Sequence, residues 1–279
     1  MKYILRDGVR LAYSERGEGG RSFVFVHGWT CDHSHFTPQI EAFCRNYHVV
    51  AVDLRGHGQS DKPQLEYTLE LFAGDIAAIC GDLKLDHPIL VGHSMGGTIA
   101  LEVATRYPDL LSGIVLIDTV LQPDAKLREA LKTMYENLLM DFSAGMDHIA
   151  SLLQLPSRDA NLHSSILKGM KDTPREVALS AFEHHLSEYD STEAILSCRI
   201  PSAYIRSLDF VANLERLRSI WPDLYIAETL DSGHFSMLEV PDQINAMLRR
   251  FSSVVSEDKI AQEGNPGREG SERVSANRK

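Results

Sequence analysis

Short apolar runs bounded by turn residues recur along the chain and alternate with stretches of helical periodicity. Such runs are typical of strands buried on both faces of a sheet. Eight segments are predicted to be strands: Lys2–Leu5, Arg10–Ser14, Phe23–Val26, His48–Val52, Ile89–Val91, Gly113–Ile117, Pro201–Ser207 and Leu224–Glu228. Apolar positions at helical spacing predict helices over Ser34–Asn46, Leu69–Leu83, Ile99–Tyr107, Leu214–Trp221 and Met237–Val254. Strands that alternate with helices predict an α/β fold.

This alternation stops after Gly113–Ile117. From Leu121 to about Arg199 no stretch resembles a strand, and helical spacing predicts four helices: Lys126–Phe142, Met146–Leu155, Leu162–Met170 and a last one, capped by Thr173, that ends near Ser187. Because the strand pattern resumes directly afterwards, we predict a helical cap inserted into the sheet rather than a separate domain. The predicted core therefore comprises residues 1–120 and 200–255, and the cap residues 121–199.

The segment from residue 256 to residue 279 has a different composition. It is charged and rich in glycine, with very few apolar side chains. Such a segment cannot bury enough apolar surface to offset the entropy lost on ordering. We therefore predict a disordered tail over residues 256–279.

The stretch between the run Ile89–Val91 and the next helix contains the pattern Gly92-His93-Ser94-Met95-Gly96. A serine in a tight turn between strand and helix is raised above the sheet edge, where its hydroxyl is exposed to substrate. The chain crosses itself closely in such a turn and leaves no room for a Cβ atom at positions 92 and 96. Glycine, which has no Cβ, is therefore expected there, as Gly92 and Gly96. The helix start also directs free N–H groups toward developing negative charge. The pattern therefore predicts Ser94 as a nucleophile.

The run Phe23–Val26 leads straight into His27-Gly28-Trp29. With the turn at Ser94, this makes the chain similar to the α/β-hydrolase superfamily over about residues 1–255. The resemblance implies a mostly parallel eight-stranded sheet with helices on both faces and a helical cap after the sixth strand. It also implies an oxyanion hole formed by the backbone N–H groups of Trp29 and Met95. For His27 we expect a structural role, as a buried imidazole that pins its loop.

A serine hydroxyl needs a base to become a nucleophile. His234 follows the last predicted strand, in a loop that closely resembles the catalytic histidine loop of the superfamily. His93 is adjacent to Ser94 but is expected to point away from it. The pair His184-His185 in the predicted cap is expected to be solvated or partly packed.

The base in turn needs an acid that holds its tautomer and stabilises the imidazolium. Asp209, after the strand Pro201–Ser207, occupies the usual position in the superfamily, but the loop is short and lacks the common glycine. Asp118 follows Gly113–Ile117. Some members, including a mycotoxin lactone hydrolase and cofactor-free quinoline-type dioxygenases, carry their acid there. We favour Asp118 and retain Asp209 as the alternative.

Composition narrows the class of partner. The formal net charge of -11 argues against binding to nucleic acid or to anionic membranes. The four cysteines form no C-x-x-C pair and are expected to be free thiols in a reducing compartment. No stretch resembles a signal peptide or a membrane span. The sequence therefore predicts a cytoplasmic protein with no membrane association, and leaves its oligomeric state open.

Together these residues predict a serine hydrolase of the carboxylesterase or lactonase kind. It would cleave a small neutral ester or lactone through an acyl-enzyme, with no cofactor and no metal ion. Three other functions stay open: a carbon–carbon bond hydrolase with the same triad, a cofactor-independent dioxygenase of the same fold, and a non-catalytic hydrolase-like receptor.

Overall fold

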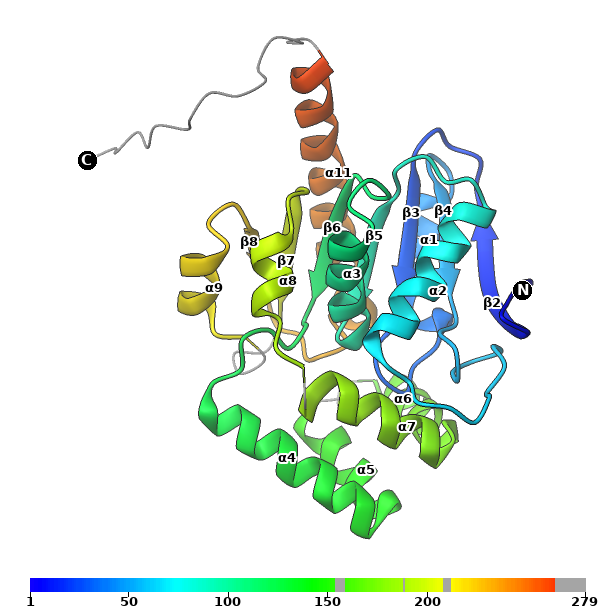
Figure 1. Ribbon diagram of the computed structural model, residues 1–279, viewed down its shortest axis with the longest axis vertical. Coiled ribbons are helices and arrows are strands. Elements are labelled where there is room, and N and C mark those ends of the chain that lie inside the picture. Colours follow the sequence, from blue (N-terminus) through cyan, green and yellow to red (C-terminus); the bar gives the residue numbers. More distant parts are fainter. Residues whose placement is uncertain (154–158, 188, 208–211, 264–279) are drawn as a thin grey trace.

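An eight-stranded sheet runs through the centre of the computed structural model, which describes residues 1–153, 159–187, 189–207 and 212–263 (Figure 1). The strands are β1 (Lys2–Arg6), β2 (Val9–Arg16), β3 (Ser22–Val26), β4 (His48–Val52), β5 (Ile89–His93), β6 (Gly113–Ile117), β7 (Ser202–Arg206) and β8 (Tyr225–Glu228). Their order in the sheet is β1-β2-β4-β3-β5-β6-β7-β8. Only the pairings β1 with β2 and β2 with β4 are antiparallel. The predicted α/β class and mostly parallel eight-stranded sheet are thereby confirmed.

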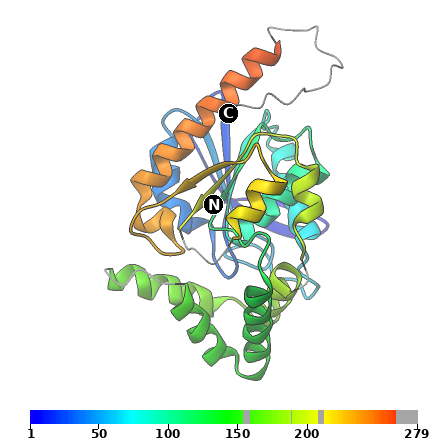
Figure 2. The same ribbon diagram turned by 90° about the vertical axis from the view of Figure 1, so that its left-hand side faces the viewer.

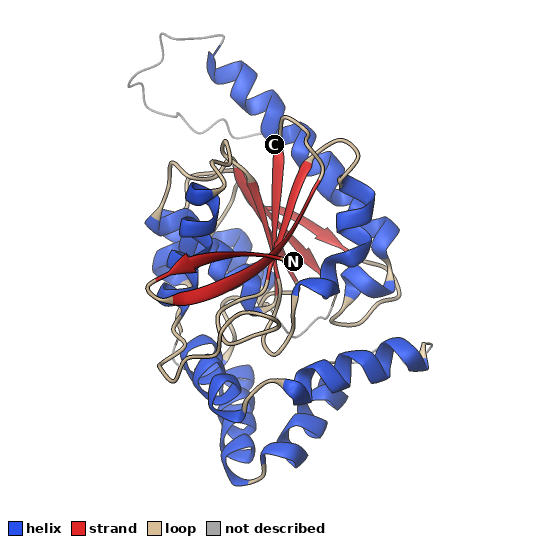
Figure 3. Ribbon diagram, turned by 90° about the vertical axis from the view of Figure 1, so that its right-hand side faces the viewer, coloured by secondary structure: helices blue, strands red, loops and turns tan. Residues whose placement is uncertain are grey.

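Helices cover both faces of the sheet, as predicted (Figures 2 and 3). On one face α1 (Thr37–Phe43) contacts α11 (Pro241–Glu263), and on the other α2 (Leu69–Asp82) contacts α3 (Met95–Arg106). A shorter helix, α9 (Leu214–Ile220), joins β7 to β8. The central strands β3, β5 and β6 are buried along their whole length. This burial explains why their sequences are continuous apolar runs rather than alternating ones.

Several predicted helix boundaries differ from the structure, in some places because a cap or a proline begins or divides a helix. The helix predicted over Ser34–Asn46 is a 3₁₀ turn, η1 (His33–Phe36), capped by Asp32 and followed by α1. The closing helix is divided into α10 (Ser236–Glu239) and α11, which begins at Pro241, since proline is favoured at the first position of a helix. The helix capped by Thr173 in our prediction begins instead at Arg175.

The tail prediction also needs correction. Helix α11 continues to Glu263, so residues 256–263, which we predicted to be disordered, are helical. Residues 264–279 lie outside the part of the chain that the structure describes. None of the helices in the described residues combines the length and the apolar character that crossing a lipid bilayer needs.

The chain between β6 and β7 is helical where the structure describes it. Its elements are α4 (Ala125–Met140), α5 (Phe142–Leu152), α6 (Ala160–Asp172), α7 (Arg175–Phe182), the π-helix η2 (Glu183–Ser187) and α8 (Thr192–Ser197). Helices α4–α7 form a separate layer at one end of the sheet (Figures 1 and 3). Helix α8 instead packs against α3 beside the sheet. The inserted segment therefore supplies both a layer at the sheet end and one helix of the layer that covers a sheet face.

Candidate active site

Ser94 occupies the single residue between β5 and α3. Its backbone dihedral angles are φ 52° and ψ −119°, a combination that residues other than glycine rarely adopt. The turn is held by two backbone hydrogen bonds: the Ser94 N–H donates to the Ile117 carbonyl (2.8 Å), and the Gly97 N–H donates to the Ser94 carbonyl (2.9 Å). The fold thus holds this serine in a strained turn, as the pattern around it predicted.

The glycines on either side of Ser94 are required by close chain crossings. A Cβ atom on Gly92 would lie 2.0 Å from the Gly96 carbonyl oxygen, and one on Gly96 would lie 2.2 Å from the Val26 carbonyl oxygen. Both obstacles are backbone atoms, which cannot rotate away as a side chain can. The sequence-based reason for these glycines is therefore confirmed.

We expect Gly92→Ala to lower the free energy of unfolding by more than about 3 kcal/mol, because the added methyl group overlaps the first turn of α3. Chemical denaturation of the purified variant measures this loss. Gly81→Ala is the matched control, since a Cβ on Gly81 meets no atom within 4 Å and the residue is exposed in α2. That control should be neutral or slightly stabilising. Equal stability of the two variants would contradict the close approach of Gly92 to the Gly96 backbone.

His234 and Asp118 are brought together although they are far apart in the sequence. His234 Nδ1 donates to Asp118 Oδ2 at 2.7 Å, and both side chains are buried. The other carboxylate oxygen of Asp118 accepts from the Ser207 backbone N–H, also at 2.7 Å. A carboxylate held at both oxygens has a fixed orientation, as has the imidazole beside it. Asp209, the alternative acid, lies outside the residues that the structure describes.

The loop that carries His234 is braced from several sides. His93 Nε2 lies 2.9 Å from the His234 carbonyl oxygen, and the His234 N–H donates to the Leu153 carbonyl at the end of α5. Burial holds the pKa of His93 well below its usual range, so its imidazole is neutral. The Nε2–H of His93 therefore donates to the His234 carbonyl and supports the backbone of the loop that carries His234.

The loop that follows β3 lies directly beside Ser94. A Cβ atom on Gly28 would lie 3.1 Å from Ser94 Cβ. Neither the Trp29 N–H nor the Met95 N–H donates to an acceptor within the described part of the chain. The Trp29 side chain extends toward α7, where its Nε1–H donates to the Ala178 carbonyl at 2.8 Å. Two backbone donors thus remain free near the serine.

His27 has the structural role that its position suggested. Its Nε2 accepts from the Leu54 N–H (3.0 Å), while its Nδ1 lies 2.8 Å from the Gly28 carbonyl oxygen. Burial lowers the pKa of His27 to about 4, which keeps the ring neutral. The imidazole therefore links two loops and takes no part in proton transfer.

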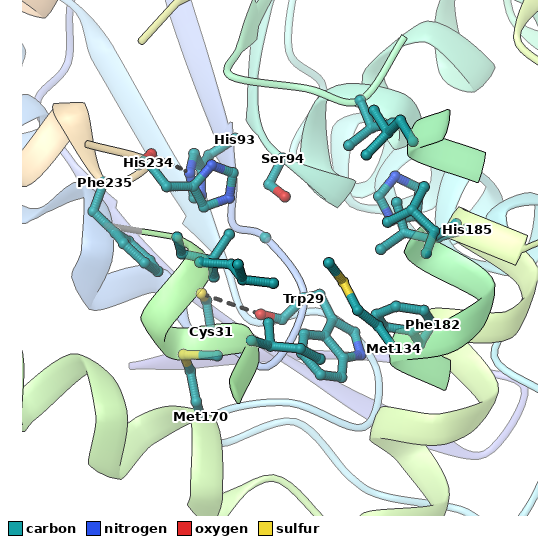
Figure 4. Close-up of a pocket in the computed structure, with 18 residues that line it drawn as sticks. Trp29, Cys31, His93, Ser94, Met134, Met170, Phe182, His185, His234 and Phe235 are labelled. Carbon is teal, nitrogen blue, oxygen red and sulfur yellow. Dashed lines mark hydrogen bonds between the residues drawn. The ribbon is translucent and has the colours of Figure 1, made fainter. Parts of the chain in front are cut away.

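Ser94 and His234 line the same cavity, whose volume is about 80 Å³ (Figure 4). That is room for roughly five to eight water-sized groups. Helices α4–α7 contribute an almost wholly apolar wall, made of Leu127, Leu131, Met134, Ile149, Leu152, Met170 and Phe182. In Figure 4 the Ser94 hydroxyl points into the space between His234 and His185. The cavity therefore presents a hydroxyl and an imidazole to a mainly apolar ligand.

Sequence reasoning missed His185. We expected the pair His184-His185 to be solvated or partly packed, but His185 is only 3% exposed and lines the cavity. Its Nε2 lies 2.9 Å from the Thr98 hydroxyl oxygen of α3. The available signal was its spacing of three residues from Phe182, which places both side chains on one helical face.

Three potential metal ligands also come together, although the sequence led us to predict no metal ion. Ligand atoms of Asp32, His33 and Asp53 lie within 4.8 Å of one another. His33 Nδ1 is 2.7 Å from Asp53 Oδ1, and the Gln59 N–H donates to the other oxygen of Asp53. Although burial opposes it, the hydrogen bond from His33 helps to hold the pKa of Asp53 below its usual range. These contacts explain the cluster as a brace for the loop after β4.

Comparison with known proteins identifies the family of this chain and structures of similar fold. A family model for the alpha/beta hydrolase fold matches residues 21–163. The 2-(acetamidomethylene)succinate hydrolase of Mesorhizobium japonicum is 28% identical over 242 residues, which are 81% of this chain and 86% of that protein. A thermophilic esterase from Thermogutta terrifontis superposes with a TM-score of 0.77 at 25% identity, over 91% of this chain and 99% of that one. Est816, described as an N-acyl homoserine lactone degrading enzyme, superposes with a TM-score of 0.79 at 24% identity, over 90% of this chain and all of that one.

Proposed function

Because the chain belongs to the alpha/beta hydrolase fold family, we propose that it is a serine hydrolase that cleaves a small neutral carboxylic ester or lactone. Ser94 is the nucleophile, His234 the general base and Asp118 the acid that orients it. The backbone N–H groups of Trp29 and Met95 form the oxyanion hole. The observation that carries this proposal is the buried 2.7 Å contact between His234 and Asp118, with His234 lining one cavity with Ser94.

The proposed reaction has two halves. His234 Nε2 takes the proton of Ser94 while Oγ attacks the substrate carbonyl, and the oxyanion hole stabilises the charged oxygen. The imidazolium then donates its proton to the departing alcohol oxygen, which leaves an acyl group on Ser94. In the second half His234 removes a proton from water, which attacks the acyl carbon and releases the acid. Asp118 stays ionised throughout and stabilises the imidazolium of each half-reaction.

The cavity wall supports a neutral substrate. None of the cavity-lining side chains that the structure describes is Lys, Arg, Asp or Glu. A charged substrate group would therefore lose its hydration without gaining a counter-ion, which is costly in an apolar site. An apolar acyl group instead gains from burial against the side chains of α4–α7.

We also propose that α4–α7 and η2 form a cap that covers this site. Two hydrogen bonds join these helices to the core and support the cap: the His234 N–H donates to the Leu153 carbonyl at the end of α5, and the Trp29 indole N–H donates to the Ala178 carbonyl of α7. Helix α8 packs against α3 and thus belongs with the core. In this proposal the core supplies the reacting groups, and the cap supplies the wall that selects the acyl chain.

We expect kcat/KM for p-nitrophenyl esters to be highest for acyl chains of about two to six carbons and to fall at least about tenfold by ten carbons, because the cavity holds few groups. Met170→Ala enlarges the wall and should move the optimum to longer chains. Met140→Ala is the matched control, because Met140 is 86% exposed and is not among the cavity-lining residues. A chain-length profile that is flat, or that is the same in both variants, would contradict this role of the wall.

An ester, lactone and thioester panel tests the reaction class. Burst release of p-nitrophenol that is lost in Ser94→Ala supports the acyl-enzyme. Oxygen uptake with a hydroxyquinolone, without ester turnover, would instead indicate the cofactor-independent dioxygenase. Turnover of none of these substrates by a folded protein would contradict the proposed function.

A further inference from the structure

The loop over residues 229–235 connects β8 to α10 and carries His234. A loop lacks the repeating backbone hydrogen bonds of a helix or a strand, so other groups must hold its backbone polar atoms. For His234 itself these groups are His93, which donates to its carbonyl, and the Leu153 carbonyl, which accepts from its N–H. The residue before it, Gly233, is buried and has an N–H that also needs an acceptor.

Glu239 supplies this acceptor. It is the last residue of α10, and both oxygens of its carboxylate accept from the Gly233 N–H, at 3.2 Å for Oε1 and 3.1 Å for Oε2. A hydrogen bond to a charged acceptor is stronger than one between neutral groups. The carboxylate therefore ties the backbone directly before His234 to the end of α10.

The environment of the Glu239 carboxylate shows that this contact has a cost. Burial raises the pKa of Glu239 above its usual range, while the N–H groups of Gly233 and Phe235 oppose the rise. Gly233 and Phe235 are the residues on either side of His234. A carboxylate that has lost part of its hydration is thus compensated by backbone donors that flank the proposed general base.

A second side chain holds the beginning of the same loop. Gln243 of α11 accepts from the Leu230 N–H through Oε1 (2.8 Å) and donates to the Leu230 carbonyl through Nε2 (3.0 Å). Leu230 precedes His234 by four residues, and its side chain is exposed. Gln243 therefore makes the same kind of contact as Glu239, from a side chain to the loop backbone, but further from the imidazole.

On the basis of the proposed serine hydrolase function, we infer that Glu239 is a positioning residue for the general base. By holding the Gly233 N–H, it fixes the backbone from which the His234 ring reaches Asp118 Oδ2, 2.7 Å away, and the cavity. A displacement of a reacting group by about 1 Å can lower a rate about 100-fold. Glu239 is not among the described residues that line the cavity, so its removal should affect kcat more than KM.

The kinetic test compares three variants with p-nitrophenyl butyrate as substrate. Glu239→Ala should lower kcat roughly 10- to 100-fold and change KM less than about threefold. Glu239→Gln should keep kcat within about threefold of the unmodified value, because its amide oxygen can accept from the Gly233 N–H. Gln243→Ala is the matched control, and we expect it to change kcat less than about threefold, since the contact that it removes is further from the reacting groups.

Proton NMR tests the same role without turnover. The His234 Nδ1–H, held against a carboxylate and shielded from water, should give a far-downfield resonance, which is assigned by its absence in His234→Ala. We expect this resonance to stay sharp in Glu239→Gln and Gln243→Ala and to broaden through exchange with water in Glu239→Ala. Thermal unfolding confirms that each variant is folded. If Glu239→Ala does not fold, Glu239→Asp replaces it, because the shorter side chain withdraws the acceptor, and it should change kcat and the resonance in the same direction.

An unchanged kcat and a sharp resonance in folded Glu239→Ala would overturn the inference. So would an equal loss of kcat in Gln243→Ala, or a loss in Glu239→Gln as large as in Glu239→Ala, because the hydrogen bond to Gly233 would then not be the cause. The serine hydrolase function would stand in each of these cases, since the unmodified protein still turns over the ester. If the unmodified protein turned over no ester while the resonance broadened in Glu239→Ala, the proposed function would fail and the hold of Glu239 on His234 would stand.

Discussion

Ser94→Ala should lower kcat for p-nitrophenyl butyrate about 10⁶-fold, with little change in the thermal unfolding temperature. The hydroxyl at the β5–α3 turn is the atom that forms the acyl-enzyme in the proposed mechanism, and an alanine methyl group cannot replace it. The cavity wall and the two free N–H donors remain, so some rate above that in water should persist. Steady-state kinetics and the amplitude of the p-nitrophenol burst measure both effects.

A double variant sharpens this test. His234→Ala should cost about as much as Ser94→Ala, and the two together should cost little more than either one, because they act as a unit. Thr105→Ala is a suitable control, since Thr105 lies further along α3 and its hydroxyl donates to the Leu101 carbonyl. Ser94→Ala activity within a hundredfold of the unmodified protein would exclude Ser94 as the nucleophile.

Asp118→Asn should lower kcat about 10⁴-fold. The Ser207 N–H can still donate to the amide oxygen, so the loop should keep its place. The amide NH₂ then faces His234 Nδ1, which favours the ring tautomer with the proton on Nε2. That tautomer cannot accept the serine proton. The loss should appear in kcat more than in KM, because Asp118 does not line the cavity.

The control for this prediction is Asp209→Asn, which should change kcat less than about threefold, as is usual for a side chain outside the reaction. The two aspartates were the competing acids in the sequence, so the pair of variants decides between them. Small and equal losses would remove both assignments. A large loss in Asp209→Asn alone would transfer the acid role to Asp209.

Most of the fold could be predicted because its signals are local. A strand buried on both faces must be apolar throughout, and the runs at β3, β5 and β6 are. Tight crossings exclude Cβ atoms, which is why the glycines around Ser94 could be interpreted without coordinates. Helix ends were predicted less well, since a proline such as Pro241 or a cap such as Asp32 shifts a boundary without changing the apolar spacing.

Only part of the candidate site could be predicted from local sequence patterns. The pattern around Ser94 is contained in five successive residues, so the nucleophile could be proposed from the chain alone. The contact of Asp118 with His234 and that of Thr98 with His185 each join segments distant in the sequence. Residue type and spacing carry no information about such distances. Packing of the inserted helices against the sheet end creates both the cavity and the buried imidazole of His185, and only the folded chain shows them.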